Sequence, residues 1–254
     1  MIYKRKIDKS LIPTVNILGV NIAAINMRWL LDFISKNINE LKGDYICVSN
    51  VHTTVMASED DNYKSIQNGG FLAIPDGGPL SSIGRFRGFT QMERTTGPSF
   101  MEEILKKGGY RHFFYGSTDE TLKKLSENFY TRYPHSKIVG LYSPPFRDLT
   151  ELEDKEIINM INKTQPDFIW VGLGAPKQEI WMASHFGQVN GLMVGVGAGF
   201  DYLAGNIRRA PVLMQKYNLE WLYRLFQDPK RLFKRYLITN SKFIFKLLLN
   251  NNSK

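Results

Sequence analysis

Cysteine and histidine are scarce in this sequence, and their scarcity excludes several classes of protein. The 254 residues include one cysteine, Cys47, and four histidines. A lone cysteine excludes an intramolecular disulfide framework and any multi-cysteine zinc or iron–sulfur site, and it is typical of a chain kept in a reducing compartment. Because the histidines form no HExxH or H-x-H pair, we expect no dedicated metal site.

Long apolar runs are also missing. The sequence has no stretch of about 18 apolar residues, and Met1–Ser10 is charged without an apolar segment, so neither a transmembrane helix nor a signal peptide is predicted. Internal repeats and low-complexity tracts are lacking as well. The composition is 43% hydrophobic and 13% aromatic, which is enough to fill a core and excludes wholesale disorder.

The positive charge is concentrated at one end of the chain. Residues 204–254 contain eleven of the 33 Lys and Arg residues but two of the 24 Asp and Glu residues, which leaves 22 of each sign in residues 1–203. A neutral body with a basic tail predicts an anionic partner, which could be membrane lipid, nucleic acid or a phosphorylated ligand. The alternative is a solvated basic helix face without a partner.

Short β-rich runs alternate with amphipathic segments through most of the chain. The predicted strands are Val15–Leu18, Tyr45–Ser49, Phe71–Ile74, His112–Tyr115, Lys137–Leu141, Phe168–Val171 and Leu192–Val196. The predicted helices between them are Met27–Ile38, Thr53–Gln67, Phe100–Lys107, Thr118–Tyr130 and Leu152–Asn162. This alternation is typical of βαβ units, so we expect an α/β fold with a mainly parallel sheet and helices on both faces.

The pattern changes after about Gly205, where strands give way to two predicted helices. These are Val212–Gln227 and Lys230–Leu249, separated at Pro229 because proline cannot continue a helix. In the second, apolar and basic residues occupy opposite sides; the apolar side carries Phe233, Leu237, Ile244 and Leu248. Such a helix either lies on an acidic bilayer surface or packs against the core. We expect residues 1–203 to form the main domain and residues 204–254 a helical appendage.

Polar residues follow two of the predicted strands directly. Asn50 comes after Tyr45–Ser49, and Asp76 comes after Phe71–Ile74 within the turn Pro75-Asp76-Gly77-Gly78. The carboxyl ends of parallel strands line one crevice, so these side chains are expected to share a site. Asp76 there could act as a general base. The alternatives are that Asn50 caps a helix and that the Asp76 segment is an ordinary turn.

Three further segments carry candidate ligand contacts. Arg94 precedes a Gly-Pro helix start and could clamp a phosphate. The run Gly172-Leu173-Gly174-Ala175-Pro176 follows another strand and places Lys177, Gln178 and Glu179 where a nucleotide-sugar would lie. A second glycine-rich turn occupies residues 195–199. Neither turn has the spacing of the GxGxxG dinucleotide fingerprint, and each could simply be a tight strand-to-helix connection.

Taken together, these segments resemble the WecG/TagA/CpsF glycosyltransferases, glycosyltransferase family 26. The resemblance lies in the ordered series NILGVNI, SNVHTTVMASED, IPDGGPL, ERTTGPSF, FFYGS, PDFIWVGLGAPKQEIWM, GVGAGFDYLAGNIRRAP and LEWLYRLFQDPKRLFKRYL, which covers residues 15–237. It implies a Rossmann-like core with a C-terminal appendage that targets the membrane and completes the active site. It further implies inverting transfer, without metal or other cofactor, from a UDP-sugar to a lipid-linked diphosphate sugar in surface polysaccharide or wall teichoic acid synthesis.

The resemblance also implies roles for individual residues. Asp76 matches the proposed general base, Gln178 the glutamine near the reacting sugar, and Arg94 the arginine before the glycine. Arg224 and Arg231 match appendage arginines that neutralise diphosphate. The remaining substrate-binding residues implied by these motifs are Asn50, Gly174, Lys177, Glu179, Gly197 and Asp201.

Two positions depart from the family pattern, and both bear on the choice of sugars. Val48 stands where many members have threonine, and the turn after Asp76 reads GGPL where the commonest form is G-x-G-[VI]. Neither change alters the expected reaction.

The expected partners are the UDP-sugar, the lipid-linked acceptor and an anionic membrane surface, with the enzyme cytoplasmic and peripheral on the inner face of the cell membrane. Self-association into a homo-oligomer is left open. Two alternatives come from other classes of function. A nicotinamide-dependent oxidoreductase needs a complete glycine fingerprint with an acid about twenty residues further on, and neither glycine turn supplies both. A nucleic-acid-binding module would use the basic helices and bind in a strongly salt-dependent way. We expect no nucleic acid partner.

Overall fold

A six-stranded parallel sheet forms the centre of the molecule. The computed structural model describes residues 4–251, without the side chains of Lys216, Arg231, Asn250 and Asn251. The strand order is β4-β3-β8-β7-β5-β6, and all five strand pairs are parallel. The strands are β3 (Tyr45–Ser49), β4 (Leu72–Pro75), β5 (Arg111–Gly116), β6 (Lys137–Tyr142), β7 (Phe168–Gly172) and β8 (Leu192–Gly195). The predicted parallel sheet is confirmed.

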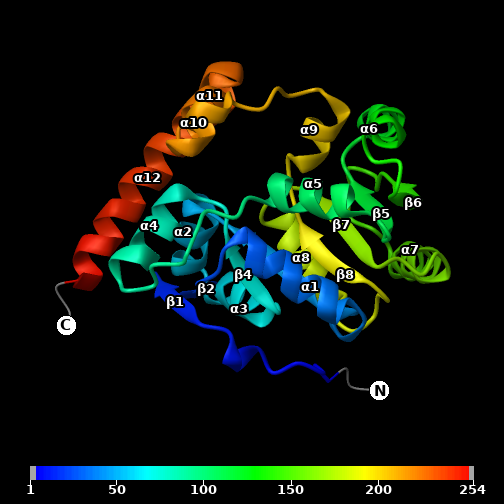
Figure 1. Ribbon diagram of the computed structural model, residues 1–254, viewed down its shortest axis with the longest axis horizontal. Helices are drawn as coiled ribbons and strands as arrows, with labels where there is room; N and C mark the ends of the chain where they lie inside the picture. The colour runs from blue at the N-terminus through cyan, green and yellow to red at the C-terminus, as the bar shows by residue number, and fades with distance from the viewer. Residues whose placement is uncertain (1–3, 252–254) are drawn as a thin grey trace.

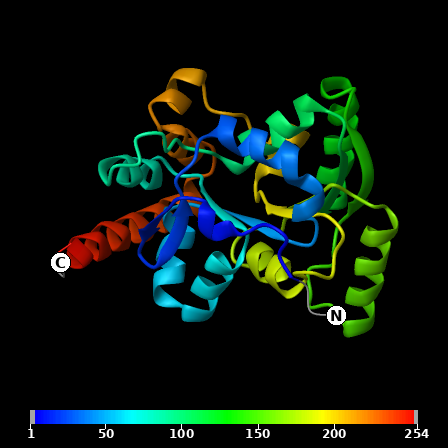
Figure 2. The same ribbon diagram turned by 60° about the horizontal axis from the view of Figure 1, so that its bottom comes forward.

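Helices cover both faces of this sheet (Figures 1 and 2). One face carries α1 (Met27–Leu41), α5 (Gly97–Lys107), α6 (Asp119–Arg132) and α9 (Gly199–Ala204). The other carries α2 (Val51–Glu59), α3 (Asp61–Gly69), α7 (Glu151–Lys163) and α8 (Lys177–Ser184). Alternate residues of a strand point to opposite faces, so Ile46 and Val48 of β3 pack in the first core while Tyr45 and Cys47 pack in the second. The predicted α/β layering is confirmed.

Several local features differ from the predicted elements. The run at Val15–Leu18 does not join the main sheet; β1 (Thr14–Ile17) pairs with β2 (Val20–Ala23) in an antiparallel hairpin. The single helix predicted over Thr53–Gln67 is two helices, because Asp60 adopts an extended conformation and its carboxylate caps α3 by accepting from the backbone N–H groups of Asn62 and Tyr63. A further helix, α4 (Gly78–Phe86), follows β4 directly.

Over residues 205–251, the part of the appendage that the structure describes beyond α9, the chain forms three helices where two were predicted. These are α10 (Val212–Lys216), α11 (Glu220–Gln227) and α12 (Pro229–Asn251). The chain turns between the first two at Asn218, which has a left-handed φ of 59°. Proline starts α12, as the break at Pro229 predicts. Figure 1 shows α12 running along the side of the molecule beside α2 and α4, and it packs against α2.

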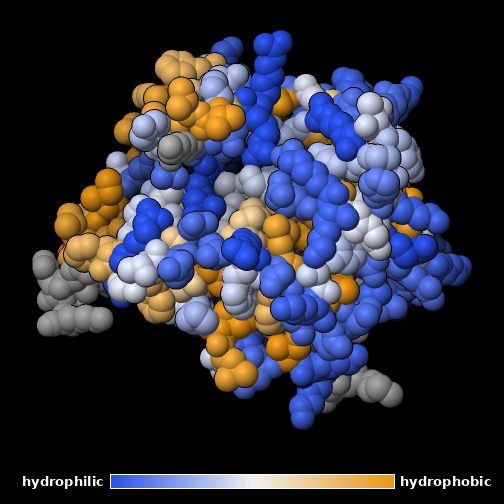
Figure 3. Space-filling model, viewed as in Figure 1, coloured by the Kyte–Doolittle hydropathy of each residue, from blue (hydrophilic) through white to orange (hydrophobic). Residues whose placement is uncertain are grey.

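The side of α12 that packs against the body is not its most apolar side. Leu232 and Phe243 are buried at 1% and 4% exposure. By contrast, the four residues of the predicted apolar stripe are about 60% exposed each (Phe233 60%, Leu237 59%, Ile244 58%, Leu248 61%). In Figure 3 apolar side chains gather over α10–α12 at one edge of the molecule. Within residues 4–251, no helix is both long and apolar enough to cross a bilayer.

Candidate active site

The carboxyl ends of β3 and β4 bring Asp76 and Asn50 together. The Asp76 backbone N–H donates to the Ser49 carbonyl at 2.8 Å, which joins the two strand ends. Asn50 caps α2, because its side-chain oxygen accepts from the N–H groups of His52 (3.0 Å) and Thr53 (3.2 Å). Its side chain also hydrogen-bonds Asp76. Asn50 therefore combines the capping role with contact to the candidate base.

Arg94 connects Asp76 to the appendage. Its Nε donates to the Asp76 carbonyl at 2.9 Å, and its Nη2 contacts Glu220 Oε2 of α11 at 2.5 Å. The segment that carries Arg94 is fixed on both sides, since the Thr95 N–H donates to the Pro75 carbonyl at 2.7 Å and Thr96 caps α5. The arginine thus lies beside the Asp76 turn rather than on the open surface.

Asp76 is a partly buried carboxyl among charges of both signs. Burial is the main influence and raises the pKa of Asp76 above its ordinary value. Arg94 and Arg224 oppose this by stabilising the carboxylate, as does the hydrogen bond with Asn50, whereas Glu220 raises the pKa further. A carboxylate with a raised pKa is a stronger base than an ordinary one, and this is what proton abstraction from a hydroxyl requires.

A tyrosine from α9 completes the contact between body and appendage. The hydroxyl of Tyr202 donates to Glu220 Oε1 at 3.4 Å, and burial raises the pKa of Tyr202 to about 12. The guanidinium of Arg224 lies 5.9 Å from the Tyr202 ring centre and that of Arg209 lies 5.8 Å from it. Both arginines are within cation–π range of one aromatic ring.

Gln178 lies at the start of α8, against the turn after β8. Its Oε1 accepts from the Gly197 N–H at 3.1 Å, and its Nε2 donates to Glu179 Oε1 at 2.7 Å. These two bonds fix which way the amide faces. Gly195 leaves room for it, because a Cβ at that position would lie 3.0 Å from Gln178 Nε2.

Glu179 is the centre of a buried chain of hydrogen bonds. Its Oε2 accepts from the Tyr63 hydroxyl at 3.1 Å, and that hydroxyl accepts from Gln67 Nε2 at 2.9 Å. Ser49 Oγ then donates to Gln67 Oε1 at 2.6 Å. The Glu179 side chain is fully buried, which raises its pKa. It was expected to project toward a ligand, but it faces the interior and supports Gln178 from behind.

The other predicted residues have less constrained surroundings. Lys177 is exposed, and a Cβ at Gly174 (φ 77°) would meet open space. Asp201 Oδ1 accepts from Asn206 Nδ2 at 3.3 Å. The prediction for Arg231 falls on a side chain outside the described part of the structure, although its position lies in α12.

Both departures from the family pattern have a packing partner. A Cβ at Gly97 would lie 3.2 Å from Val48 Cγ1, so Val48 fills the space that the missing side chain of Gly97 leaves. A Cβ at Gly78 would lie 2.7 Å from Asn218 Cγ. Asn218, which lies between α10 and α11, therefore packs against Gly78. This contact places the appendage directly against the Asp76 turn.

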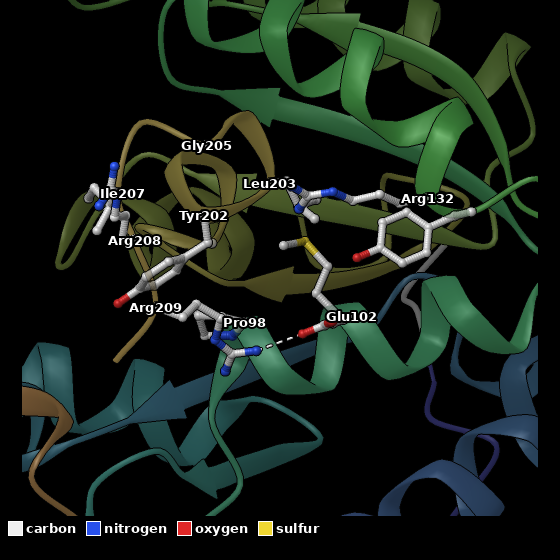
Figure 4. A pocket seen from close by; sticks show the side chains of 12 residues that line it. Pro98, Glu102, Arg132, Tyr202, Leu203, Gly205, Ile207, Arg208 and Arg209 are labelled. Carbon is white, nitrogen blue, oxygen red and sulfur yellow. Dashed lines mark hydrogen bonds and ion pairs between the residues drawn. The ribbon is translucent and has the colours of Figure 1, made fainter. Parts of the chain in front are cut away.

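A pocket of about 320 Å³ lies between α5 and α9 (Figure 4). Its wall combines apolar side chains with arginines, and its lining includes Tyr202, Arg132, Arg208 and Arg209. Arg209 is held by ion pairing with Glu102 at 2.6 Å and by a hydrogen bond to Ser99 Oγ at 2.7 Å. Tyr202 thus lines the pocket and also donates to Glu220.

Sequence reasoning missed Glu220, Tyr202 and Asn218. Tyr202 and Asn218 carry no local signal. Glu220 has one, since it is one of two acids in a segment with eleven bases, and a carboxylate in so basic a segment is a candidate partner for a buried arginine. No cluster of three or more His, Cys, Asp or Glu side chains suited to a metal occurs among the residues the structure describes.

Comparison with known proteins gives one consistent result. The family model described as the glycosyl transferase WecG/TagA/CpsF family matches residues 15–254. Two curated relatives from Staphylococcus aureus, strains MW2 and NCTC 8325 / PS 47, are each 28% identical to this chain over 234 residues, covering 89% of this chain and 89% of the relative. Each of these relatives is named N-acetylglucosaminyldiphosphoundecaprenol N-acetyl-beta-D-mannosaminyltransferase.

Proposed function

The chain belongs to the WecG/TagA/CpsF family of glycosyltransferases, and from this premise we propose that it moves a sugar from a UDP-sugar to a polyprenyl-diphosphate-linked sugar in bacterial surface polysaccharide or wall teichoic acid synthesis. The S. aureus relatives are named for transfer of N-acetylmannosamine to an undecaprenol-diphosphate N-acetylglucosamine. An N-acetylmannosamine- or glucose-type donor is therefore the first candidate here.

The observation that carries the proposal is the placement of Asp76 at the strand ends, where Arg94 donates to its backbone carbonyl and the charges of Arg94 and Arg224 both act on its carboxyl. In the proposed reaction the Asp76 carboxylate takes the proton of the acceptor hydroxyl. The hydroxyl oxygen forms a bond to the anomeric carbon while the bond from that carbon to the UDP oxygen breaks, which inverts the anomeric centre. The electron pair of the broken bond stays on the diphosphate, and the proton stays on Asp76 until solvent removes it.

The developing charge on the diphosphate needs cationic groups close by. We propose that Arg94, whose Nε donates to the Asp76 carbonyl, and Arg224, whose charge lowers the pKa of Asp76, supply them. This is a role that divalent cations fill in many other enzymes, and we propose that the arginines make a metal unnecessary here. Gln178, held by Gly197 and Glu179, is proposed to contact the reacting sugar.

The appendage is proposed to bring the enzyme to its lipid-linked acceptor at the inner face of the cell membrane. The exposed apolar stripe of α12 and the basic residues around it match a helix lying in a bilayer interface. Each Lys or Arg near an acidic leaflet contributes roughly 1 kcal/mol. If α12 used its apolar stripe to pack against the core, the stripe would be buried. Because the stripe is exposed, we favour the interpretation that it contacts the membrane. We propose residues 204–254 as the unit that docks the enzyme, and residues 1–203 as the catalytic core.

The proposal is tested by a donor screen. A panel of UDP-sugars is offered with a short-chain lipid-diphosphate N-acetylglucosamine acceptor in the presence of EDTA, and UDP release and the mass of the lipid product are measured. We expect one donor to give acceptor-dependent UDP release and a product heavier by one sugar. If no donor extends the acceptor, the proposed reaction is wrong. If EDTA abolishes transfer, the arginines do not replace a metal.

A further inference from the structure

We propose that Glu220 is a positioning residue of the active site, whose carboxylate fixes the plane of the Arg94 guanidinium and so couples docking of the appendage to catalysis. This inference rests on the proposed function and adds to it a residue and a mechanism of coupling. Residues 204–254 are strongly basic and contain two acids. One of these, Glu220, is buried against the body at 6% exposure.

The geometry around Arg94 defines what Glu220 does. A guanidinium has five N–H donors. One N–H on Nε is bonded to the Asp76 carbonyl and one on Nη2 to Glu220 Oε2. Two acceptors at two corners of a planar group fix its orientation, and three N–H donors remain to bind an anion. Arg94 is therefore presented with a fixed plane beside Asp76, as bidentate recognition of a phosphate requires.

Glu220 is itself held in place by two residues of the body. Tyr202 of α9 donates to Oε1 at 3.4 Å while Arg94 occupies Oε2 at 2.5 Å. Two residues before Glu220 in sequence, Asn218 fits against Gly78 in the Asp76 turn. The carboxylate thus reaches Arg94 only when α11 is seated, so an undocked appendage leaves the arginine with one of its two anchors.

The contrast with an ion-paired contact between appendage and body at the protein surface separates this role from simple adhesion. Lys242 and Lys246 of α12 contact Glu59 of α2 at 3.0 and 3.7 Å. That pair lies at the surface, since the Glu59 side chain is 39% exposed, and exposed pairs contribute little to stability. Glu59→Gln is therefore a matched control, because it also removes a glutamate that pairs with the appendage but leaves the Asp76 surroundings unchanged.

The test compares Glu220→Gln, Glu220→Asp and Glu59→Gln in the full-length enzyme. The steady-state kcat and KM for the UDP-sugar and the pH profile of kcat/KM are measured with the short-chain acceptor, and thermal unfolding is followed in parallel. We expect Glu220→Gln to lower kcat by about tenfold or more, as misplacement of a catalytic group does, with a smaller change in KM. Glu59→Gln is expected to match the wild type, and Glu220→Asp to recover part of the loss.

The pH profile distinguishes positioning from a purely structural role. The charged groups that act on Asp76 are Arg94 and Arg224, which lower its pKa, and Glu220, which raises it, while Asn50 hydrogen-bonds it. Removing the Glu220 charge lowers the pKa of Asp76, so the acidic limb of the profile moves to lower pH in Glu220→Gln and stays in place in Glu220→Asp. Loss of docking alone does not distinguish the two variants in this way.

Two results would overturn the inference and leave the proposed function intact. The first is wild-type kcat and an unmoved acidic limb in Glu220→Gln. The second is a lower KM with unchanged or higher kcat, which would make Glu220 a competitor that occupies Arg94 in place of substrate. Failure of the wild-type enzyme to extend the acceptor with any donor would instead refute the proposed function itself.

Discussion

Replacing Tyr63 by phenylalanine tests whether the buried chain behind Gln178 stabilises the fold. The substitution keeps the ring, which is 3% exposed, and removes the hydroxyl. Two hydrogen bonds are lost: one to the Glu179 carboxyl at 3.1 Å and one from Gln67 at 2.9 Å. A hydrogen bond to a charged group contributes about 1.5–3 kcal/mol to stability and a neutral one about 0.5–1.5 kcal/mol. We therefore expect Tyr63→Phe to lower the free energy of unfolding by about 2–4 kcal/mol.

The loss is measured by thermal unfolding at neutral pH. For a protein of this size each kcal/mol shifts Tm by about 2–4 °C, so Tyr63→Phe should lower Tm by about 5–15 °C. Tyr130→Phe is the matched control. Because Tyr130 is 58% exposed, this variant should have the same Tm as the wild type. A Tm for Tyr63→Phe within about 1 °C of the wild type would show that the chain contributes nothing to stability.

The same variant gives a pH dependence whose sign follows from Glu179. Burial raises the pKa of Glu179 in the folded protein, so this residue contributes most to stability at low pH, where it is protonated in both states. Stability is then lost as the pH rises from the unfolded pKa through the folded one. The Tyr63 hydrogen bond lowers the folded pKa, so Tyr63→Phe raises it further. The stability deficit of the variant should shrink on acidification; a deficit that grows would contradict this reasoning.

Three further variants, a single substitution, a double substitution and a truncation, test the appendage. Gly78→Ala places a Cβ 2.7 Å from Asn218 Cγ and should destabilise docking by about 1–3 kcal/mol, seen as faster proteolysis after residue 204; unchanged proteolysis would show that the contact is not limiting. Phe233→Ser with Leu237→Ser should weaken binding to anionic liposomes without lowering transfer to a short-chain acceptor; unchanged liposome binding would exclude this face as the membrane contact. Truncation after Ala204 should abolish liposome binding and transfer alike, and full activity of the truncated body on lipid acceptor would refute the role of the appendage.

The parallel sheet could be predicted because its signals are local. The strands β3, β4, β5, β7 and β8 are mostly buried runs, while the edge strand β6 is half-buried, and the predicted Tyr45–Ser49 has the same bounds as β3. A strand was predicted over Val15–Leu18, but its hairpin partner β2 was missed, because the turn at Leu18-Gly19 (φ 51° and 90°) lacks the usual Asn-Gly or Asp-Gly pair. The division of the first appendage helix depends on the left-handed Asn218, whose place is fixed by Gly78 about 140 residues earlier.

The residues of the candidate site also differ in whether a local sequence signal reveals them. Asp76 and Asn50 could be found because parallel strands end at one edge, and Arg94 because it precedes a Gly-Pro helix start; the structure brings all three together. Glu179 was expected to face a ligand, since sequence alone does not show which side of α8 turns inward. Glu220 and Tyr202 depend on how the appendage docks, and no short-range pattern encodes that contact.

The most direct test of the account is the rate of glycosyl transfer by Asp76→Asn under single-turnover conditions, with EDTA present and the preferred UDP-sugar and acceptor saturating. Asparagine keeps the shape of the side chain but accepts no proton, so transfer should fall by about two orders of magnitude or more while donor binding and Tm stay near wild-type values. Transfer at the wild-type rate would remove Asp76 from the mechanism and with it the role assigned to the arginines around it.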